Sequence, residues 1–225
     1  MSNAFKKWLI AYIAPSMRAP DGGISGWLAK RIMNNANPPS IRKGFDRLFA
    51  NGNNTSTDCF VEIGAGQGIG LEYFAQQQQQ DVPRRIVCVE ISPDFRTMLQ
   101  ELKNNNHPYA DRIEIHEDDC KAMPYLEDAS VDKIFAMNVI YFLDPLDAYL
   151  AEMQRVLKPG GVVSFCCKFA TVKDAGGAFV NIVEADILEC IEKRNAFDVT
   201  STFVDMGGET GNPMHSFTEI LATKR

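Results

Sequence analysis

The chain has no cysteines spaced as C-x-x-C, although it contains six cysteines in 225 residues. That spacing is typical of structural zinc sites and redox motifs, and the scattered positions give no disulfide framework either. Four of the thiols fall in apolar, strand-like runs: Cys59, Cys88, Cys166 and Cys167. We expect them to be small buried hydrophobes in a reduced, cytoplasmic protein that binds no metal.

The sequence also lacks a basic excess and a long apolar run. A net charge of −6 argues against a nucleic-acid partner, because such a partner needs a basic face. The apolar run 8–14 follows two lysines, but it is far below the roughly 20 residues of a membrane-spanning helix. No small-x-small cleavage pattern follows it. We expect an amphipathic helix there and no transmembrane segment, and no feature predicts an oligomeric state.

Short apolar segments alternate with helical patterns from residue 58 onward, which predicts a doubly wound α/β fold with a seven-stranded, mostly parallel sheet. No helical pattern separates the last two strands, so the last strand should run antiparallel. Residues 1–50 form a predicted helical N-terminal cap, and 51–225 form the main domain. The expected strands are 58–63, 85–90, 112–116, 133–137, 162–167, 197–204 and 215–223; the expected helices after the cap are 68–80, one from Pro93, 145–157 and 177–194.

Glycine fills every second position after the first expected strand, at Gly64, Gly66 and Gly68. A strand that turns sharply into a helix gathers backbone N–H groups at one point, where the negative end of a ligand can bind. A dinucleotide fingerprint, G-x-G-x-x-G, would require glycine at position 69, which is Ile69. This disfavours an NAD-linked oxidoreductase. A glycine turn without a ligand stays an alternative.

The spacing acidic-x-G-x-G-x-G, with Glu62 as the acid, resembles motif I of the class I S-adenosylmethionine-dependent methyltransferases of the methyltransferase-11-like type. Segments 130–134 and 152–161 are also similar to signatures of this family, and the resemblance covers about 56–168. It implies a Rossmann-like fold and S-adenosyl-L-methionine as cofactor, with S-adenosyl-L-homocysteine as product. In such a protein the loop would wrap the amino-acid end of the cofactor through Glu62, Gly64, Ala65, Gly66 and Gly68.

Polar residues at the ends of the next two expected strands fit the same cofactor. Glu90 ends the second strand, where a carboxylate can accept hydrogen bonds from both hydroxyls of a ribose, and Ile91 would lie against the purine. The resemblance assigns the adenine amino group to Asp119 and a ring nitrogen to the N–H of Cys120, although Asp118 stands where glycine is common. Alternatively, these acids are solvated surface residues that bind no ligand.

The acceptor side is less defined. Asn138 follows the fourth strand and would face the methionine part of the cofactor or the acceptor, and Tyr141 would lie near the acceptor. Ordinary packing explains both equally well. None of the three histidines stands in a motif for a base; His116, at the end of the third strand, is the first candidate on the substrate side. The Asn-Pro-Pro-aromatic tetrapeptide of relatives that methylate planar amino groups does not follow the fourth strand, and Asn37-Pro38-Pro39-Ser40 lies too early.

The sequence therefore predicts a methyltransferase that acts on a small-molecule acceptor, either a metabolite or a lipid-like compound. An activated sulfonium methyl group needs mainly an in-line nucleophile, so the enzyme's task is positioning. No catalytic residue is assigned. A non-catalytic protein that binds S-adenosylmethionine is the main alternative, and an NAD-linked oxidoreductase is the less favoured one.

Overall fold

The computed structural model describes residues 12, 16–20, 23–50, 57–172 and 179–225. Apart from Tyr12, the expected amphipathic helix at 8–14 lies outside these residues. In the part of the chain that is described, no helix combines the length and the apolar character needed to cross a membrane.

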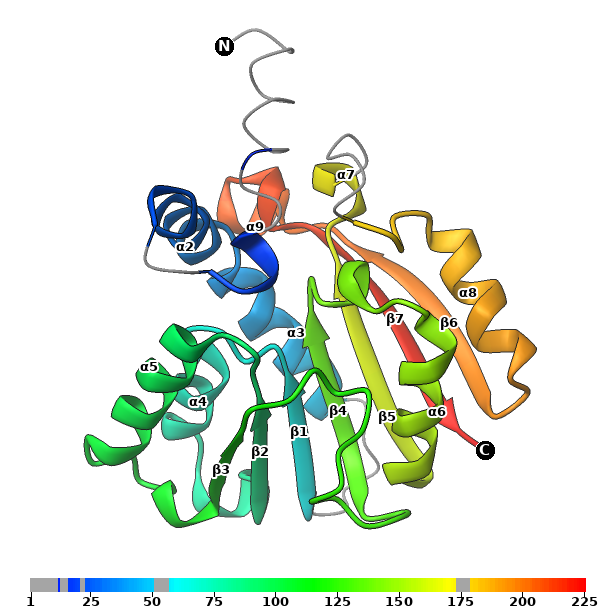
Figure 1. The fold of residues 1–225 in the computed structure, drawn as a ribbon, viewed down its shortest axis with the longest axis horizontal. Helices are drawn as coiled ribbons and strands as arrows, with labels where there is room; N and C mark the ends of the chain where they lie inside the picture. Colours follow the sequence, from blue (N-terminus) through cyan, green and yellow to red (C-terminus); the bar gives the residue numbers. More distant parts are fainter. Residues whose placement is uncertain (1–11, 13–15, 21–22, 51–56, 173–178) are drawn as a thin grey trace, which may run out of the picture.

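A seven-stranded sheet forms the centre of the molecule, with strand order β3-β2-β1-β4-β5-β7-β6 (Figure 1). All neighbouring pairs are parallel except those that β7 makes with β5 and β6. The predicted mostly parallel sheet with an antiparallel last strand is therefore confirmed. The strands are β1 (Cys59–Ile63), β2 (Arg85–Val89), β3 (Ile113–His116), β4 (Val131–Met137), β5 (Leu157–Cys167), β6 (Phe197–Val204) and β7 (Phe217–Lys224).

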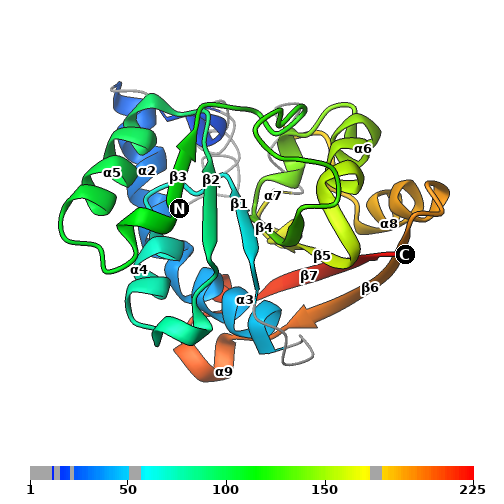
Figure 2. The ribbon, with the colours of Figure 1, turned by 90° about the horizontal axis from the view of Figure 1, so that it is seen from below.

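Helices cover both faces of the sheet, as a doubly wound fold requires (Figures 1 and 2). One face carries α3 (Pro38–Ala50), α4 (Ile69–Ala75) and α5 (Pro93–Asn104), and the other carries α6 (Leu146–Val156) and α8 (Glu184–Lys193). Three further helices lie beyond the carboxyl ends of the parallel strands: α2 (Ile24–Ala36), α7 (Phe169–Val172) and α9 (Gly207–Thr210) (Figure 1). Short 3-10 turns occupy Gln79–Asp81, Ala110–Arg112, Ile140–Phe142 and Pro213–His215.

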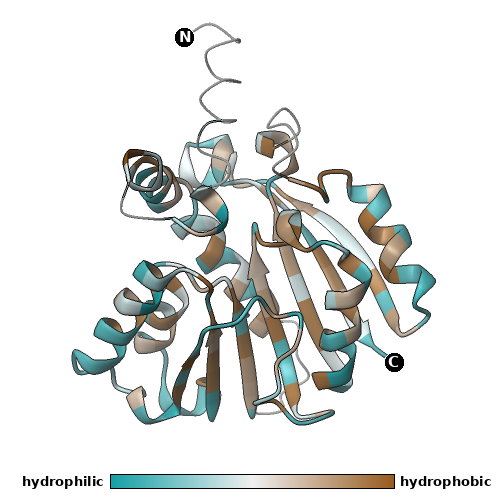
Figure 3. Ribbon diagram, in the orientation of Figure 1, coloured by the Kyte–Doolittle hydropathy of each residue, from teal (hydrophilic) through white to brown (hydrophobic). Residues whose placement is uncertain are grey.

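Alternation along the strands gives each face of the sheet its own apolar core. In β1, Val61 and Ile63 pack with the α6 and α8 side of the sheet, whereas Phe60 packs with the α3, α4 and α5 side. Apolar residues recur along α6 with the helical period and form a buried stripe: Leu146, Tyr149, Leu150, Met153 and Val156. Figure 3 shows apolar strands in the interior and hydrophilic outer helix faces.

Helix α3 belongs to this core, although it lies within the predicted cap. The ring of Phe45 is fully buried, with its centroid 4.6 Å from that of Phe135 and 5.4 Å from that of Phe60. Near the end of the helix, Arg47 pairs at 2.7 Å with Glu219, which is 2% exposed. We propose that only the part of the N-terminal region before α3 acts as a cap.

Replacing Phe45 with alanine should lower the free energy of unfolding by about 3–5 kcal/mol, because it opens a cavity between α3 and the sheet. Urea unfolding followed by circular dichroism measures this change. Phe203→Ala is the matched control, since Phe203 is 68% exposed on β6 and its loss should cost less than about 1 kcal/mol. Equal effects of the two substitutions would show that α3 contributes little to the core.

The helices differ from the prediction at three places. Helix α4 ends at Ala75, so the following glutamine run does not continue it as expected; the exposed glutamines have no apolar stripe to bury. Helix α8 begins at Glu184 instead of 177. The predicted loop between the last two strands contains the short helix α9.

Strand β5 begins five residues earlier than predicted. Leu157 already pairs with Val131, and the register then shifts so that Val162 pairs with Lys133. The segment Lys158-Pro159-Gly160-Gly161 therefore forms a bulge-like irregularity inside β5 and does not lie before the strand. Gly160 has φ +77°, a conformation that glycine adopts without strain.

Candidate functional site

A cavity of about 410 Å³ opens at the carboxyl ends of β1, β2, β4 and β5. The strand order reverses between β1 and β4, and open α/β sheets bind ligands at this point. The walls are mainly apolar, and the residues come from all parts of the chain: Met17, Arg18, Ile32, Met33, Ala36, Asn37, Ile63, Gly64, Gly66, Val89, Glu90, Ile91, Phe95, Asp118, Asp119, Met137, Asn138, Val139, Tyr141, Phe142, Leu143, Lys168, Thr171, Val172, Phe179 and Met214.

The glycine loop has the conformation that its sequence predicts. Gly64, Gly66 and Gly68 all have positive φ, at 67°, 55° and 84°. A Cβ on Gly64 would lie 2.6 Å from the side chain of Val139. By contrast, a Cβ on Gly66 would have no atom nearer than 3.8 Å, so the backbone is open to the cavity at this position. Gly68 caps α4 and Ala65 is buried within the turn, and neither lines the cavity.

Glu90 joins the loop to the end of β2. Its side chain lines the cavity, yet the residue is only 4% exposed. One carboxylate oxygen accepts a hydrogen bond from the Gly66 N–H at 2.9 Å, and the other accepts from the Ser92 N–H at 2.8 Å. Burial raises the pKa of the Glu90 carboxyl, while these backbone hydrogen bonds act in the opposite direction. Ile91 lies beside it in the cavity wall.

Glu62 lies beneath the loop instead of in the cavity wall. It is 3% exposed, and its Oε2 has no hydrogen-bond partner among the described residues. Burial and the nearby charge of Glu90 raise the pKa of Glu62 to about 8. A side chain at Gly70, on α4, would collide with this carboxyl group. Glu62 is therefore a buried, protonatable group directly below the loop.

Two acids after β3 also reach the cavity. Asp118 and Asp119 both line it. The N–H of Cys120, which the resemblance assigns to a ring nitrogen, donates to Asp118 Oδ1 at 3.0 Å. Asp119 accepts from the Lys121 N–H at 3.0 Å and from the Tyr149 hydroxyl at 3.3 Å. Cys120 itself is fully buried and contributes no side chain to the cavity.

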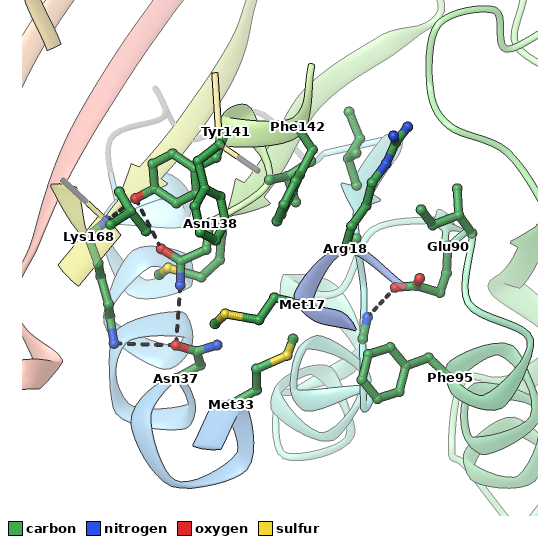
Figure 4. Close-up of a pocket in the computed structure, with 18 of the residues that line it drawn as sticks. Met17, Arg18, Met33, Asn37, Glu90, Phe95, Asn138, Tyr141, Phe142 and Lys168 are labelled. Carbon is green, nitrogen blue, oxygen red and sulfur yellow. Dashed lines mark hydrogen bonds between the residues drawn. The ribbon is translucent and has the colours of Figure 1, made fainter. Parts of the chain in front are cut away.

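A hydrogen-bonded polar cluster occupies the other end of the cavity, across the two methionines Met17 and Met33 (Figure 4). Asn138, whose φ is +57°, donates to Asn37 Oδ1 at 3.2 Å. The Tyr141 hydroxyl accepts a hydrogen bond from the backbone N–H of Lys168. It lies 3.5 Å from Asn138 Oδ1. Burial raises the pKa of the Tyr141 hydroxyl, so the phenol stays neutral.

His116 is not brought to this cavity. Its ring stacks on Tyr125 with a centroid distance of 3.6 Å, and its Nε2 lies 3.2 Å from Glu114. The prediction that it lies on the substrate side therefore finds no support in its position, because β3 is the edge strand of this part of the sheet. Within the described residues, no group of three or more His, Cys, Asp or Glu side chains is placed to hold a metal ion.

Several cavity residues were missed by the sequence reasoning. Met17, Arg18, Met33 and Asn37 come from the N-terminal region, which carries no recognisable pattern. Lys168 had a usable signal: it is a charged residue directly after a buried strand, as Glu90 is. Ligands of open α/β sheets bind at the carboxyl ends of the strands, and this rule applies to Lys168 as it does to Glu90.

Residues 61–165 match the methyltransferase domain family, a span that begins within β1 and ends within β5. With the glycine loop, Glu90 and the strand order in place, this match identifies the region. Residues 61–165, just under half of the chain, form a methyltransferase domain of the class I S-adenosylmethionine-dependent type. The predicted Rossmann-like fold is confirmed as well, and the glycine at position 69 that an NAD fingerprint requires is absent.

Individual members of the methyltransferase family are similar over the same region. A sterol 4-C-methyltransferase of Caenorhabditis elegans is 36% identical over 101 residues, which are 45% of this chain and 28% of that protein. A thiol S-methyltransferase of Mus musculus is 27% identical over 108 residues, covering 48% of this chain and 41% of the relative. The chain thus spans less than half the length of these curated relatives.

A solved structure agrees with the fold over most of the chain. A methyltransferase from Aquifex aeolicus superposes with a TM-score of 0.63 and 18% sequence identity, covering 87% of this chain and 97% of the other. At this identity the likeness concerns the fold alone. It extends beyond the family match to the helices and strands on both sides of 61–165.

Proposed function

We propose that this protein transfers a methyl group from S-adenosyl-L-methionine to an apolar small-molecule acceptor. One observation carries the proposal: a single cavity holds Glu90 and the glycine loop at one end and an apolar, hydrogen-bonding chamber at the other (Figure 4). A donor site and an acceptor site that share one cavity allow the two reactants to meet.

The chemistry of the cavity residues fits the cofactor. The open backbone at Gly66 gives room for the methionine part beside Gly64 and Asn138. The Glu90 carboxylate suits two ribose hydroxyls, and it would exchange its bond to the Gly66 N–H for them. Ile91 and Asp119 would hold the adenine. Three acids in the wall, Glu90, Asp118 and Asp119, also complement a cationic ligand.

The acceptor chamber favours a hydrophobic body. Its walls include Phe142, Val172 and Phe179, next to Met17 and Met33. Methionine adapts to irregular apolar ligands. The named relatives act on a sterol and on thiols, and both names are compatible with such a chamber.

The protein's main contribution to the reaction would be positioning. The bound cofactor supplies a methyl group already activated by its sulfonium. The side chains of α2 and of the segment before it cover the cavity and exclude water, while Asn138 and Tyr141 fix the acceptor end. Holding nucleophile and methyl group in line supplies roughly 7–11 kcal/mol of the barrier reduction.

Titration calorimetry with S-adenosylhomocysteine tests the proposal. We expect binding to the wild type and a loss of about 10- to 100-fold in Glu90→Ala, because hydrogen bonds to a buried carboxylate contribute about 1.5–3 kcal/mol. Glu101→Ala, which removes an exposed acid of α5, should bind like the wild type. No binding to the folded wild type, or tight binding of NADH instead, would overturn the proposal. Binding without methyl transfer to any acceptor would indicate a non-catalytic binding protein.

A further inference from the structure

Of the lysines that the structure describes, Lys168 alone lies in the wall of the cavity. It directly follows β5 and is 6% exposed. In the sheet, β5 lies beyond β4 and on the opposite side of β1 from β2, the strand that Glu90 directly follows. Lys168 is therefore placed at the acceptor end of the cavity, away from the ribose end (Figure 4).

The hydrogen bonds of Lys168 suit a neutral amine. Its Nζ donates to the Ala36 carbonyl at 2.6 Å and to Asn37 Oδ1 at 3.4 Å, and both acceptors are uncharged. Among the described residues it forms no ion pair with a carboxylate. A neutral amine has two N–H donors, which these two oxygens use, and one lone pair, which remains. An ammonium would bring a third N–H into an apolar chamber.

Burial, and not a neighbouring charge, determines the pKa of the Lys168 amine. Desolvation is the cause that lowers the pKa of Lys168 to about 8. Two titratable residues adjoin Lys168: Tyr141, which accepts from its backbone N–H, and Cys167, which precedes it; burial raises the pKa of both, so they stay uncharged. The charged groups elsewhere in the cavity wall are Arg18, Glu90, Asp118 and Asp119. Charged side chains of α2, α3 and β7 pair away from it: Lys30 with Asp94, Arg42 with Glu72, Lys43 with Glu209, and Arg47 with Glu219.

We propose that Lys168 is the general base of this enzyme and that the acceptor presents a thiol or a hydroxyl group on an apolar body. The inference rests on the proposed methyl transfer. The Lys168 lone pair takes the proton of the acceptor S–H or O–H, and the electron pair of that bond stays on the acceptor atom. That atom forms a bond to the methyl carbon as the carbon–sulfur bond breaks, and the electron pair of the broken bond goes to the sulfur.

Charge is conserved within the chamber during this step. Before transfer the positive charge is on the sulfonium; afterwards it is on the Lys168 ammonium and the sulfur is neutral. A second positive charge in a cavity of about 410 Å³ is unfavourable. A cationic cofactor therefore drives Lys168 toward the neutral form before the reaction begins.

The release of protons on cofactor binding tests whether Lys168 becomes neutral, and it requires no acceptor. Calorimetry at pH 8 in buffers of different ionisation enthalpy counts the protons that S-adenosylmethionine binding expels. We expect the wild type to release up to about half a proton more than Lys168→Met, since a group with a pKa near 8 is half protonated there. The uncharged sulfur of S-adenosylhomocysteine should remove most of this excess. Equal release by wild type and Lys168→Met would overturn the proposal; no binding by either protein would instead overturn the proposed function.

Acceptor chemistry is tested with three probes that each contain a linear eight-carbon chain: octanethiol, 4-octylphenol and octanoate. We expect transfer to the thiol or the phenol, with kcat/KM rising with pH and levelling near pH 8, and a loss of at least about 100-fold in both Lys168→Met and Lys168→Arg. Arginine keeps the positive charge but cannot act as a base. An active Lys168→Arg would show that the residue pairs with an anion instead. Transfer to octanoate alone, or to neither protic probe, would overturn the acceptor class.

Discussion

Replacing Gly66 with arginine is expected to abolish cofactor binding while the protein stays folded. The left-handed backbone at this position costs a residue other than glycine about 1–2 kcal/mol. No atom obstructs a Cβ there, so steric damage to the fold is absent. The long cationic side chain would enter the cavity that Gly66 lines and would repel the sulfonium. We expect affinity for S-adenosylmethionine to fall at least 100-fold, about 2.7 kcal/mol, in titration calorimetry.

Gly160→Arg is the matched control for this substitution. Gly160 also has positive φ and open space around its Cβ, but it lies outside the cavity, in the irregular part of β5. The control carries the same backbone strain and the same added charge, and it should bind the cofactor like the wild type. If Gly66→Arg bound equally well, the glycine loop would not be the cofactor site.

Stability should fall as the pH rises through the titration of Glu62. The folded-state pKa of about 8 lies above the ordinary value of 4.5 because the carboxyl group is buried next to Glu90. Between these two values the folded protein keeps a proton that the unfolded chain has lost. The stabilisation is therefore fully present below about pH 4.5 and is lost as the pH approaches 8.

Glu62→Gln should remove this dependence, because the amide resembles the protonated acid in shape and does not titrate. Urea unfolding at pH 5 and pH 8 measures the effect. Between these pH values the wild type should lose about 3 kcal/mol more than Glu62→Gln. Glu101→Gln, on the exposed face of α5, should behave like the wild type. The same loss in all three proteins would mean that Glu62 is ionised when folded.

The fold was predictable because its signals are local. Each parallel strand is a short apolar run bounded by turn residues, and the stripe of α6 has a clean helical period. The predicted bounds of strands and helices are wrong where tertiary contacts determine where an element begins or ends. β5 extends to Leu157 because β4 offers a pairing partner, and α4 stops at Ala75 because the glutamines after it have nothing to pack against.

The cofactor end of the site was likewise accessible from sequence, because Gly64, Gly66 and Glu90 follow directly from strand ends. The acceptor end was not. Asn37 and Lys168 are 131 residues apart, and only the contact between the C-terminal end of α2 and the residue after β5 brings them together. His116 shows the converse: it is also at a strand end, but its strand lies too far from the point where the strand order reverses.

A crystal structure with S-adenosylhomocysteine bound tests the central claim most directly. We predict the ribose hydroxyls on the Glu90 carboxylate, the adenine beside Ile91 and Asp119, and the homocysteine part against Gly64 and Gly66. The sulfur should point toward the chamber of Asn138, Tyr141 and Lys168. A ligand bound elsewhere, or a cavity left empty at saturating ligand concentration, would contradict the account.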